Sequence, residues 1–191
     1  MAAIPALSQA TPARPDRPET AAVIWVDPGN ISSKDLLEGP GGEKHHPQPP
    51  LKFLKEDNHG HNSKLDVEDA KGDKWKAKLG IEAHTEPVAS RLLWAVGYFT
   101  NENYYIPDVE VKNLPMHLKR GQGHVISPGH LDGARLQRPP PREKKSAEWN
   151  WRHNPLVGTR EFNGLRVMMA LISNWDLKDD NNAIFSGTNK A

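Results

Sequence analysis

Three short segments in which polar and apolar residues alternate follow one another between residues 52 and 79. They cover residues 52–57, 64–69 and 74–79, and short turns join them. Alternation with a period of two is typical of β-strands that bury one face. Strands joined by such short connections pair antiparallel, since a parallel pair needs a long crossover. The pattern therefore predicts a small antiparallel sheet, which constrains the fold more than any other part of the chain.

A helix is predicted directly after the third strand. Pro87 suits the first turn of a helix that starts near residue 85, and apolar residues follow at helical spacing as far as Gly97. Residues 98–99 and 104–111 supply further strand-like sequence. This order of strands, helix and strands predicts an α+β fold.

Charged residues gather between the third strand and this helix. Lys76 and Lys78 share one face of the strand, which is either open to water or carries a lysine that reaches a nucleotide phosphate. Glu82 and Glu86 lie just before or inside the first turn of the helix. Either glutamate could pair with Lys78.

Only part of the chain is apolar enough to form a packed core. Hydrophobic residues make up 36% of its 191 residues, and there are 17 prolines. This composition predicts ordered units separated by looser segments. The expected divisions are a flexible segment over 1–50, a sheet-and-helix unit over 51–118, a loop-rich connector over 119–147 and a further unit over 148–191.

The first fifty residues carry weaker predictions. A short strand is expected at 22–26, a short helix around 35–37 and a flexible connector over 39–50. Residues 2–10 resemble the end of a secretory signal but lack its basic start and apolar middle. Export is therefore a hypothesis, with the cytoplasm as the alternative.

Composition excludes several classes of function. With 25 basic and 24 acidic residues the net charge is +1, which gives no overall electrostatic reason to bind nucleic acid or an anionic membrane. The chain has no cysteine, so disulfides, thiolate catalysis and cysteine–zinc sites are all excluded. No apolar run approaches the roughly 20 residues that a membrane-spanning helix needs.

A second helix is predicted from Thr159, a residue that caps helix starts well. Apolar residues recur after it at steps of three and four, which would bury one face in a core. Before this helix, residues 131–145 are predicted to be loop, and Trp149 and Trp151 are predicted to pack in the core. The apolar positions of the helix are Phe162, Leu165, Met168, Met169 and Ile172.

The segment after this helix carries residues suited to phosphoryl transfer. Asp176 can accept or orient the proton of a substrate hydroxyl, Lys178 can neutralise a transferring phosphate, and Asn181 can ligate magnesium. Their spacing matches the catalytic loop of protein kinases, although Asn174 and Trp175 stand where that loop has His and Arg. The alternative is a solvated loop that caps a helix.

Three stretches of the chain, residues 74–80, 88–98 and 174–182, resemble the protein-kinase-like superfamily. The similarity is to atypical bacterial branches, such as HipA-like and spore-coat-type kinases, and covers about residues 51–185. It implies an amino-terminal lobe, in which residues 51–111 form one antiparallel sheet that carries the helix from about residue 86 to 96. This lobe is joined to an incomplete and mainly helical second lobe. It also implies ATP and magnesium as cofactors, with a nucleotide and an unidentified acceptor as partners.

The resemblance also assigns roles to single residues. Lys78 matches the lysine that binds the nucleotide phosphates, and Glu86 matches the helix glutamate that orients it. Asp176 matches the catalytic aspartate and Asn181 the metal-binding asparagine. Gly60 is the single glycine of the loop that stands in place of the glycine-rich loop.

The chain departs from the kinase pattern at its end. Kinases carry a second metal-binding aspartate after the catalytic loop, and residues 186–191 contain none. We therefore expect a fragment of a longer protein, or a relic of a nucleotide site, that turns over ATP negligibly. Three functions stay open: a kinase-like phosphotransferase or a portion of one, a catalytically silent kinase-like binding module, and an unrelated scaffold.

Overall fold

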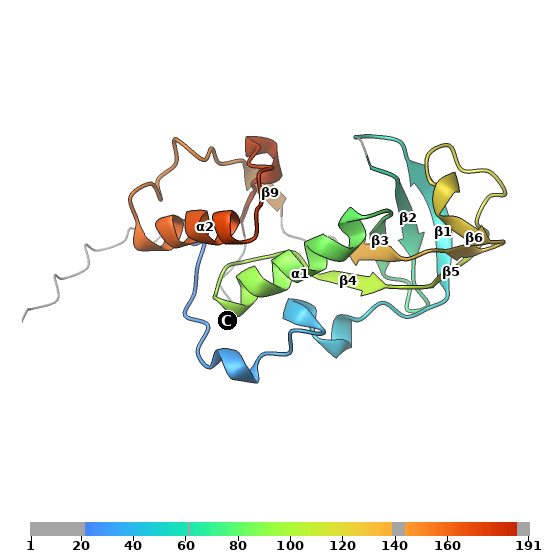
Figure 1. Cartoon of the computed structure of the whole chain (residues 1–191), viewed down its shortest axis with the longest axis horizontal. Helices are drawn as coiled ribbons and strands as arrows, with labels where there is room; N and C mark the ends of the chain where they lie inside the picture. The colour runs from blue at the N-terminus through green and yellow to red at the C-terminus, as the bar shows by residue number, and fades with distance from the viewer. Residues whose placement is uncertain (1–21, 61, 139–143, 187–191) are drawn as a thin grey trace, which may run out of the picture.

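An eight-stranded mixed sheet with the helix α1 (Glu82–Ala95) against it forms the larger part of the molecule, and α2 (Arg160–Leu171) lies beyond the end of α1 (Figure 1). This computed structural model describes residues 22–60, 62–138 and 144–186. The strands stand in the order β4-β8-β3-β2-β1-β5-β7-β6. Their bounds are β1 (Leu51–Asp57), β2 (Lys64–Glu68), β3 (Lys74–Lys78), β4 (Asn103–Ile106), β5 (Val109–Lys112), β6 (Val125–Ser127), β7 (His130–Leu131) and β8 (Ala134–Gln137).

The predicted three-stranded meander is confirmed. β1, β2 and β3 pair antiparallel in chain order, and buried residues alternate along β2 and β3. In β3 the buried residues are Trp75 and Ala77, so the lysines between and beside them face the other side of the sheet. The fold is therefore α+β, as the order of elements predicted.

The expectation that residues 51–111 form one antiparallel sheet is wrong in two respects. β5 pairs with β1 in parallel, and β8 lies between β3 and β4. Only two residues separate β4 from β5, yet four strands stand between them in the sheet, so the sheet must curl to bring its two parts together. Alternation along single strands carries no information about such curling.

The prediction of a loop over residues 131–145 is also wrong. These residues contain the end of β7, the whole of β8 and the start of β9 (Lys144–Ala147), and β9 pairs with β10 (Ile184–Ser186) in a separate two-stranded sheet. The first three residues of β8 are all buried, because α1 covers this part of the sheet. A strand buried on both faces shows no alternation, and the sequence signal is lost.

Helix α1 begins earlier than predicted, at Glu82, so Pro87 falls beyond the first turn. It ends as expected at Gly97, whose φ is 98°. The amide of Gly97 donates to the carbonyl of Trp94, and the amide of Tyr98 donates to that of Leu93. These two bonds are the Schellman arrangement that terminates a helix at a glycine.

A flexible segment is predicted over residues 1–50. Residues 22–50 pack against the rest of the chain, so the prediction is wrong for this part. Residues 1–21 lie outside the described residues. The expected strand at 22–26 is reduced to one bridge between Trp25 and Tyr98. The expected connector over 39–50 contains two 3₁₀ turns, η2 (Gly39–Gly41) and η3 (Glu43–His45). The sequence predicts a short helix around residues 35–37. The structure has instead a 3₁₀ turn, η1 (Ile31–Ser33), just before these residues.

Two groups of buried side chains hold the molecule together. The larger lies inside the curled sheet and includes Trp75, Tyr104 and Leu136. The second joins the C-terminal end of α1 to α2 through Tyr98, and Trp149, Trp151 and Ile172 are among the side chains packed around it. The predicted packing of the two tryptophans is confirmed, as is that of the apolar face of α2: Phe162, Leu165 and Met169 are buried.

Helix α2 docks closely on Tyr98. The Tyr98 hydroxyl donates to the carbonyl of Glu161, 2.8 Å away, and a Cβ placed on Gly164 would lie 2.5 Å from the same hydroxyl. As predicted, Thr159 caps the helix by accepting from the amide of Phe162. These contacts fix where the segment after α2 begins.

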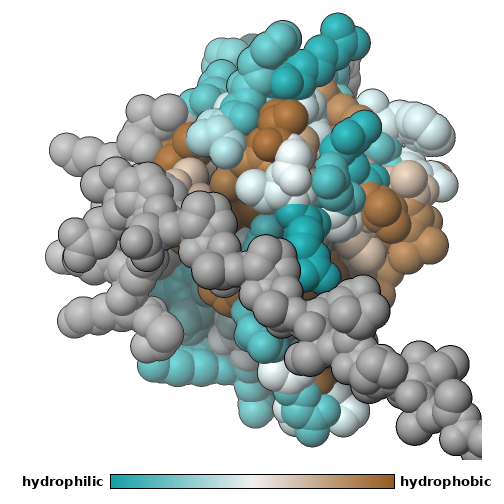
Figure 2. Space-filling model, turned by 90° about the vertical axis from the view of Figure 1, so that its left-hand side faces the viewer, coloured by the Kyte–Doolittle hydropathy of each residue, from teal (hydrophilic) through white to brown (hydrophobic). Residues whose placement is uncertain are grey.

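The outer face of α2 is exposed. On this face the exposed fractions are 67% for Val167 and 74% for Leu171, and Trp175, just after the helix, is 83% exposed. Figure 2 faces this end of the molecule and shows apolar surface between hydrophilic patches. Within the described residues, no helix is long and apolar enough to cross a membrane.

Candidate functional site

Lys78, the last residue of β3, lies between two carboxylates of α1. Its side chain is only 12% exposed, and its Nζ lies 2.5 Å from Oε2 of Glu82 and also bonds Oε1 of Glu86. Glu82 and Glu86 are four residues apart in one helix, so their side chains point to the same face. The sequence predicts that Lys78 pairs with Glu82 or with Glu86. In the structure it pairs with both.

The second oxygen of Glu86 faces Arg135 of β8. Arg135 Nε lies 2.8 Å from Glu86 Oε2, and its Nη1 donates to Gln137 at 2.7 Å and to Asn103 at 3.3 Å. Burial lowers the pKa of the Arg135 guanidinium, and the negative charge of Glu86 opposes this shift. Glu86 therefore bridges two nearly buried cations, Lys78 and Arg135.

Arg135 is not among the predicted site residues, because its segment was predicted to be loop. The available signal was a single arginine inside the short run Ala134–Gln137, between Ala134 and Leu136. A charged residue inside an apolar strand is stable only when it is paired, so such a position points to a buried ion pair.

The loop between β1 and β2 approaches the same cluster through Asn62, whose Nδ2 donates to Glu82 Oε2 at 2.7 Å. Gly60 lies in this loop with a φ of 74°, a conformation that favours glycine. Its carbonyl accepts from Arg120 Nη1 at 2.6 Å, and the carbonyl of Asn58 accepts from the same nitrogen at 3.0 Å. Arg120 thus fixes the loop that contains Gly60.

A carboxylate in turn fixes the backbone around Arg120. Glu56 accepts hydrogen bonds from the amides of Lys119, Arg120 and Gly121 at 2.7, 2.7 and 3.0 Å. Burial alone would raise the pKa of Glu56, but these three amide bonds outweigh it and the pKa is lowered. The ionised carboxylate therefore stabilises the conformation that holds the β1–β2 loop.

The segment 174–182 begins where α2 ends. Ser173 has a φ of 53°, and the amide of Asn174 donates to the carbonyl of Met169, which closes the helix. Asn174 Oδ1 then accepts from the amide of Asp176 at 3.0 Å. Asp179 accepts from Asn150 Nδ2 and from the amide of Trp151, which ties the segment to the chain before α2.

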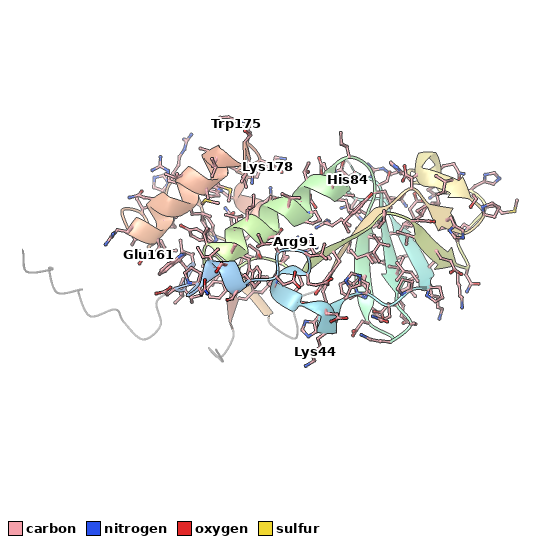
Figure 3. All side chains as sticks on the ribbon, turned by 60° about the horizontal axis from the view of Figure 1, so that its bottom comes forward. Lys44, His84, Arg91, Glu161, Trp175 and Lys178 are labelled. Atoms are coloured by element: carbon pink, nitrogen blue, oxygen red, sulfur yellow. The ribbon has the colours of Figure 1, made fainter. Side chains whose placement is uncertain are left out.

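Asp176, Lys178 and Asn181 lie together in this segment. Lys178 Nζ is 3.1 Å from Asp176 Oδ1, and Asn181 Nδ2 donates to the backbone carbonyl of Asp176 at 3.3 Å. The Asp176 carboxylate is exposed, so it is accessible to a ligand. Figure 3 shows Trp175 and Lys178 at the opposite end of α2 from Glu161.

Lys78 acts electrostatically on Asp176. The hydrogen bond from Lys178 has the largest effect and lowers the pKa of Asp176, Asn181 lowers it further, and the charge of Lys78 adds to the shift. The charge of Lys78, at the end of β3, therefore has the smallest of these effects on Asp176.

Lys78 is nearly buried, whereas Asp176 is exposed at the surface. Two hollows near α1 have volumes of about 220 and 230 Å³, and neither is lined by Lys78 or Asp176. Within the described residues there is no group of three His, Asp or Glu that could hold a metal ion. A metal here would need ligands beyond the described residues.

The predicted residues thus fall into two groups and one separate position. Comparisons with protein-family models, curated proteins and solved structures give no match. The interpretation of the site therefore depends on its own residues. The first group is Lys78 and Glu86, the second is Asp176, Lys178 and Asn181, and Gly60 is separate.

Proposed function

We propose that the chain carries a kinase-like phosphotransferase site, or a portion of one, in which the phosphates of ATP bind between Lys78 and the segment 174–182. The observation that supports this most is the nearly buried Lys78 at the end of β3, which is held by the helix carboxylate Glu86. A lysine held in this way and the exposed pair of Asp176 and Lys178 match the needs of phosphoryl transfer, which depends on positioning and charge.

Each residue has a role in this proposal. Lys78 binds a phosphate oxygen, and Glu86 holds the Lys78 ammonium in position. Asp176 is ionised at neutral pH, and its pKa is lowered further by Lys178, so it can accept a hydrogen bond from the hydroxyl of the acceptor. Lys178 offsets the negative charge of the transferring group.

Magnesium fits the site only together with a nucleotide. Asn181 uses its amide nitrogen on the carbonyl of Asp176, which leaves the amide oxygen as its candidate metal ligand. Magnesium would neutralise phosphate charge, and the phosphate oxygens would supply most of its ligands. Because the described residues hold no further cluster of metal ligands, we expect binding of nucleotide with little turnover.

On this proposal the sheet and α1 correspond to the first lobe of a kinase, and α2 with its following segment corresponds to part of the second. Lys78 at the end of β3 would then face Asp176 across the junction between the lobes. The sequence resemblance and the ion pair between Lys78 and Glu86 support this arrangement.

The proposal is tested by equilibrium titration with ATP and magnesium. Wild type is expected to bind, and Lys78→Met to bind about 10- to 100-fold more weakly, because a charged hydrogen bond contributes about 1.5–3 kcal/mol. Lys74→Met, on the same face of β3 but exposed, is the control. Absence of binding by wild type, or equal losses in both variants, would contradict a nucleotide site at Lys78.

A phosphotransfer assay on the same proteins separates an active site from a silent one. Turnover that Asp176→Ala abolishes indicates a phosphotransferase. Binding without turnover indicates a catalytically silent kinase-like module.

A further inference from the structure

The two carboxylates that contact Lys78 are held in different ways. Glu86 has a cation at each oxygen: Lys78 donates a hydrogen bond to Oε1, and the nearly buried Arg135 forms an ion pair with Oε2 without a hydrogen bond. Glu82 has one neutral partner besides Lys78, the amide of Asn62. The side chain of Glu82 is 49% exposed, whereas that of Glu86 is 32% exposed. Glu82 is therefore the partner that can leave at lower cost.

The position of Glu82 is one that suits a phosphate. Its Oε2 receives the Lys78 ammonium at 2.5 Å and the Asn62 amide at 2.7 Å. Carboxylate and phosphate oxygens accept hydrogen bonds from the same donors. A phosphate oxygen in this place would meet the same two donors.

The charges of the cluster lead to the same conclusion. Lys78 and Arg135 carry two positive charges, and Glu82 and Glu86 carry two negative ones, so the cluster as a whole is neutral. A polyanion gains nothing from a neutral cluster. When Glu82 moves away, one positive charge becomes available at Lys78.

We propose that Glu82 is an internal counterion that occupies the phosphate position at Lys78 and is displaced when a phosphate binds, which rests on the proposed function of this site. Glu82 thereby weakens the affinity for nucleotide, and Glu86 strengthens it by holding Lys78. Two glutamates on one lysine therefore have opposite effects on binding.

The test compares Glu82→Gln with Glu86→Gln in titrations with ATP and magnesium and with inorganic tripolyphosphate. Glu82→Gln keeps an acceptor for Asn62 and is expected to bind roughly three- to tenfold more tightly, because the change removes both an ion pair that competes for Lys78 and a charge that repels phosphate. Glu86→Gln is expected to bind more weakly. Both differences should shrink as the salt concentration rises. Glu110→Gln, exposed on β5, is the control.

Binding by wild type with equal or weaker binding by Glu82→Gln overturns the inference but leaves the nucleotide site in place. No binding by any variant overturns both. A measurement on wild type itself covers the case in which a variant does not fold. The side-chain amide signal of Asn62 should shift as nucleotide saturates the protein, because its bond to Glu82 is replaced, and an unchanged signal overturns the inference.

Discussion

Lys76 and Lys78 stand two residues apart on one face of β3, yet their surroundings differ. Lys76 lies 2.7 Å from Asp57 and 3.4 Å from Asp66, both within the sheet, and its side chain is 44% exposed. The hydrogen bond from Lys76 holds the pKa of Asp57 well below its ordinary value. Lys76 thus cross-links strands, whereas Lys78 pairs with two glutamates of α1. The sequence placed both on one face and could not separate their roles.

The pKa of Asp176 gives a prediction at the scale of single residues. Lys178→Met is expected to raise this pKa toward its ordinary value, and Lys78→Met to raise it by a smaller amount, since each change removes a cation that favours the carboxylate. The pKa is measured by NMR titration of the Asp176 carboxyl carbon, with Lys74→Met as the control. If Lys78→Met leaves the pKa at its wild-type value, Lys78 and Asp176 are not neighbours.

The sign of the corresponding stability effect follows from the direction of the shift. A carboxyl whose pKa is lowered in the folded state contributes stability above its unfolded pKa, and this contribution is lost as pH falls through the folded pKa. Lys178→Met should therefore lose less stability than wild type when the protein is acidified through this range. At neutral pH the carboxylate is ionised in both proteins.

At the scale of elements, local signals predicted the ends of helices well where caps were present. Thr159 before α2 and Gly97 after α1 both act as the sequence predicted. A proline in the first turn of a helix would place the start of α1 near residue 85. The helix in fact begins at Glu82, so Pro87 lies inside it. β8 was missed because burial on both faces removes alternation. The fold was therefore predictable for its half-buried strands and capped helix ends, and not for its doubly covered strand.

The docking of α2 on Tyr98 gives a prediction at this scale. Alanine is normally better than glycine within a helix by about 1 kcal/mol. Gly164→Ala is nevertheless expected to destabilise the protein by about 1–3 kcal/mol, because its Cβ would lie 2.5 Å from the buried and hydrogen-bonded Tyr98 hydroxyl. Thermal or denaturant unfolding measures the change.

The matched control for this change removes the oxygen that causes the clash. In a Tyr98→Phe background, Gly164→Ala should become neutral or stabilising, since the helix propensity of alanine then decides the outcome. A stabilising effect of Gly164→Ala in wild type would show that α2 does not dock on Tyr98 in this way.

At the scale of the whole molecule, the candidate site depends on two separate parts of the core. The core inside the sheet positions Lys78, while the second group around Tyr98 positions α2 and therefore Asp176. Sequence spacing predicted the residues within each part, because those residues are close along the chain. It could not predict the contacts of Arg135 and Asn62 with the two glutamates, because these depend on tertiary packing.

The central claim is that Lys78 and the segment 174–182 bind one ligand together. It is tested most directly by NMR during a titration with ATP and magnesium, following side-chain signals of Lys78, Asp176 and Asn181, with Lys74 as the internal control. The account predicts that the signals of the first three shift along one saturable curve with a common dissociation constant, while that of Lys74 stays unchanged. Shifts confined to Lys78 or to the segment 174–182, or separate dissociation constants for the two, would contradict it.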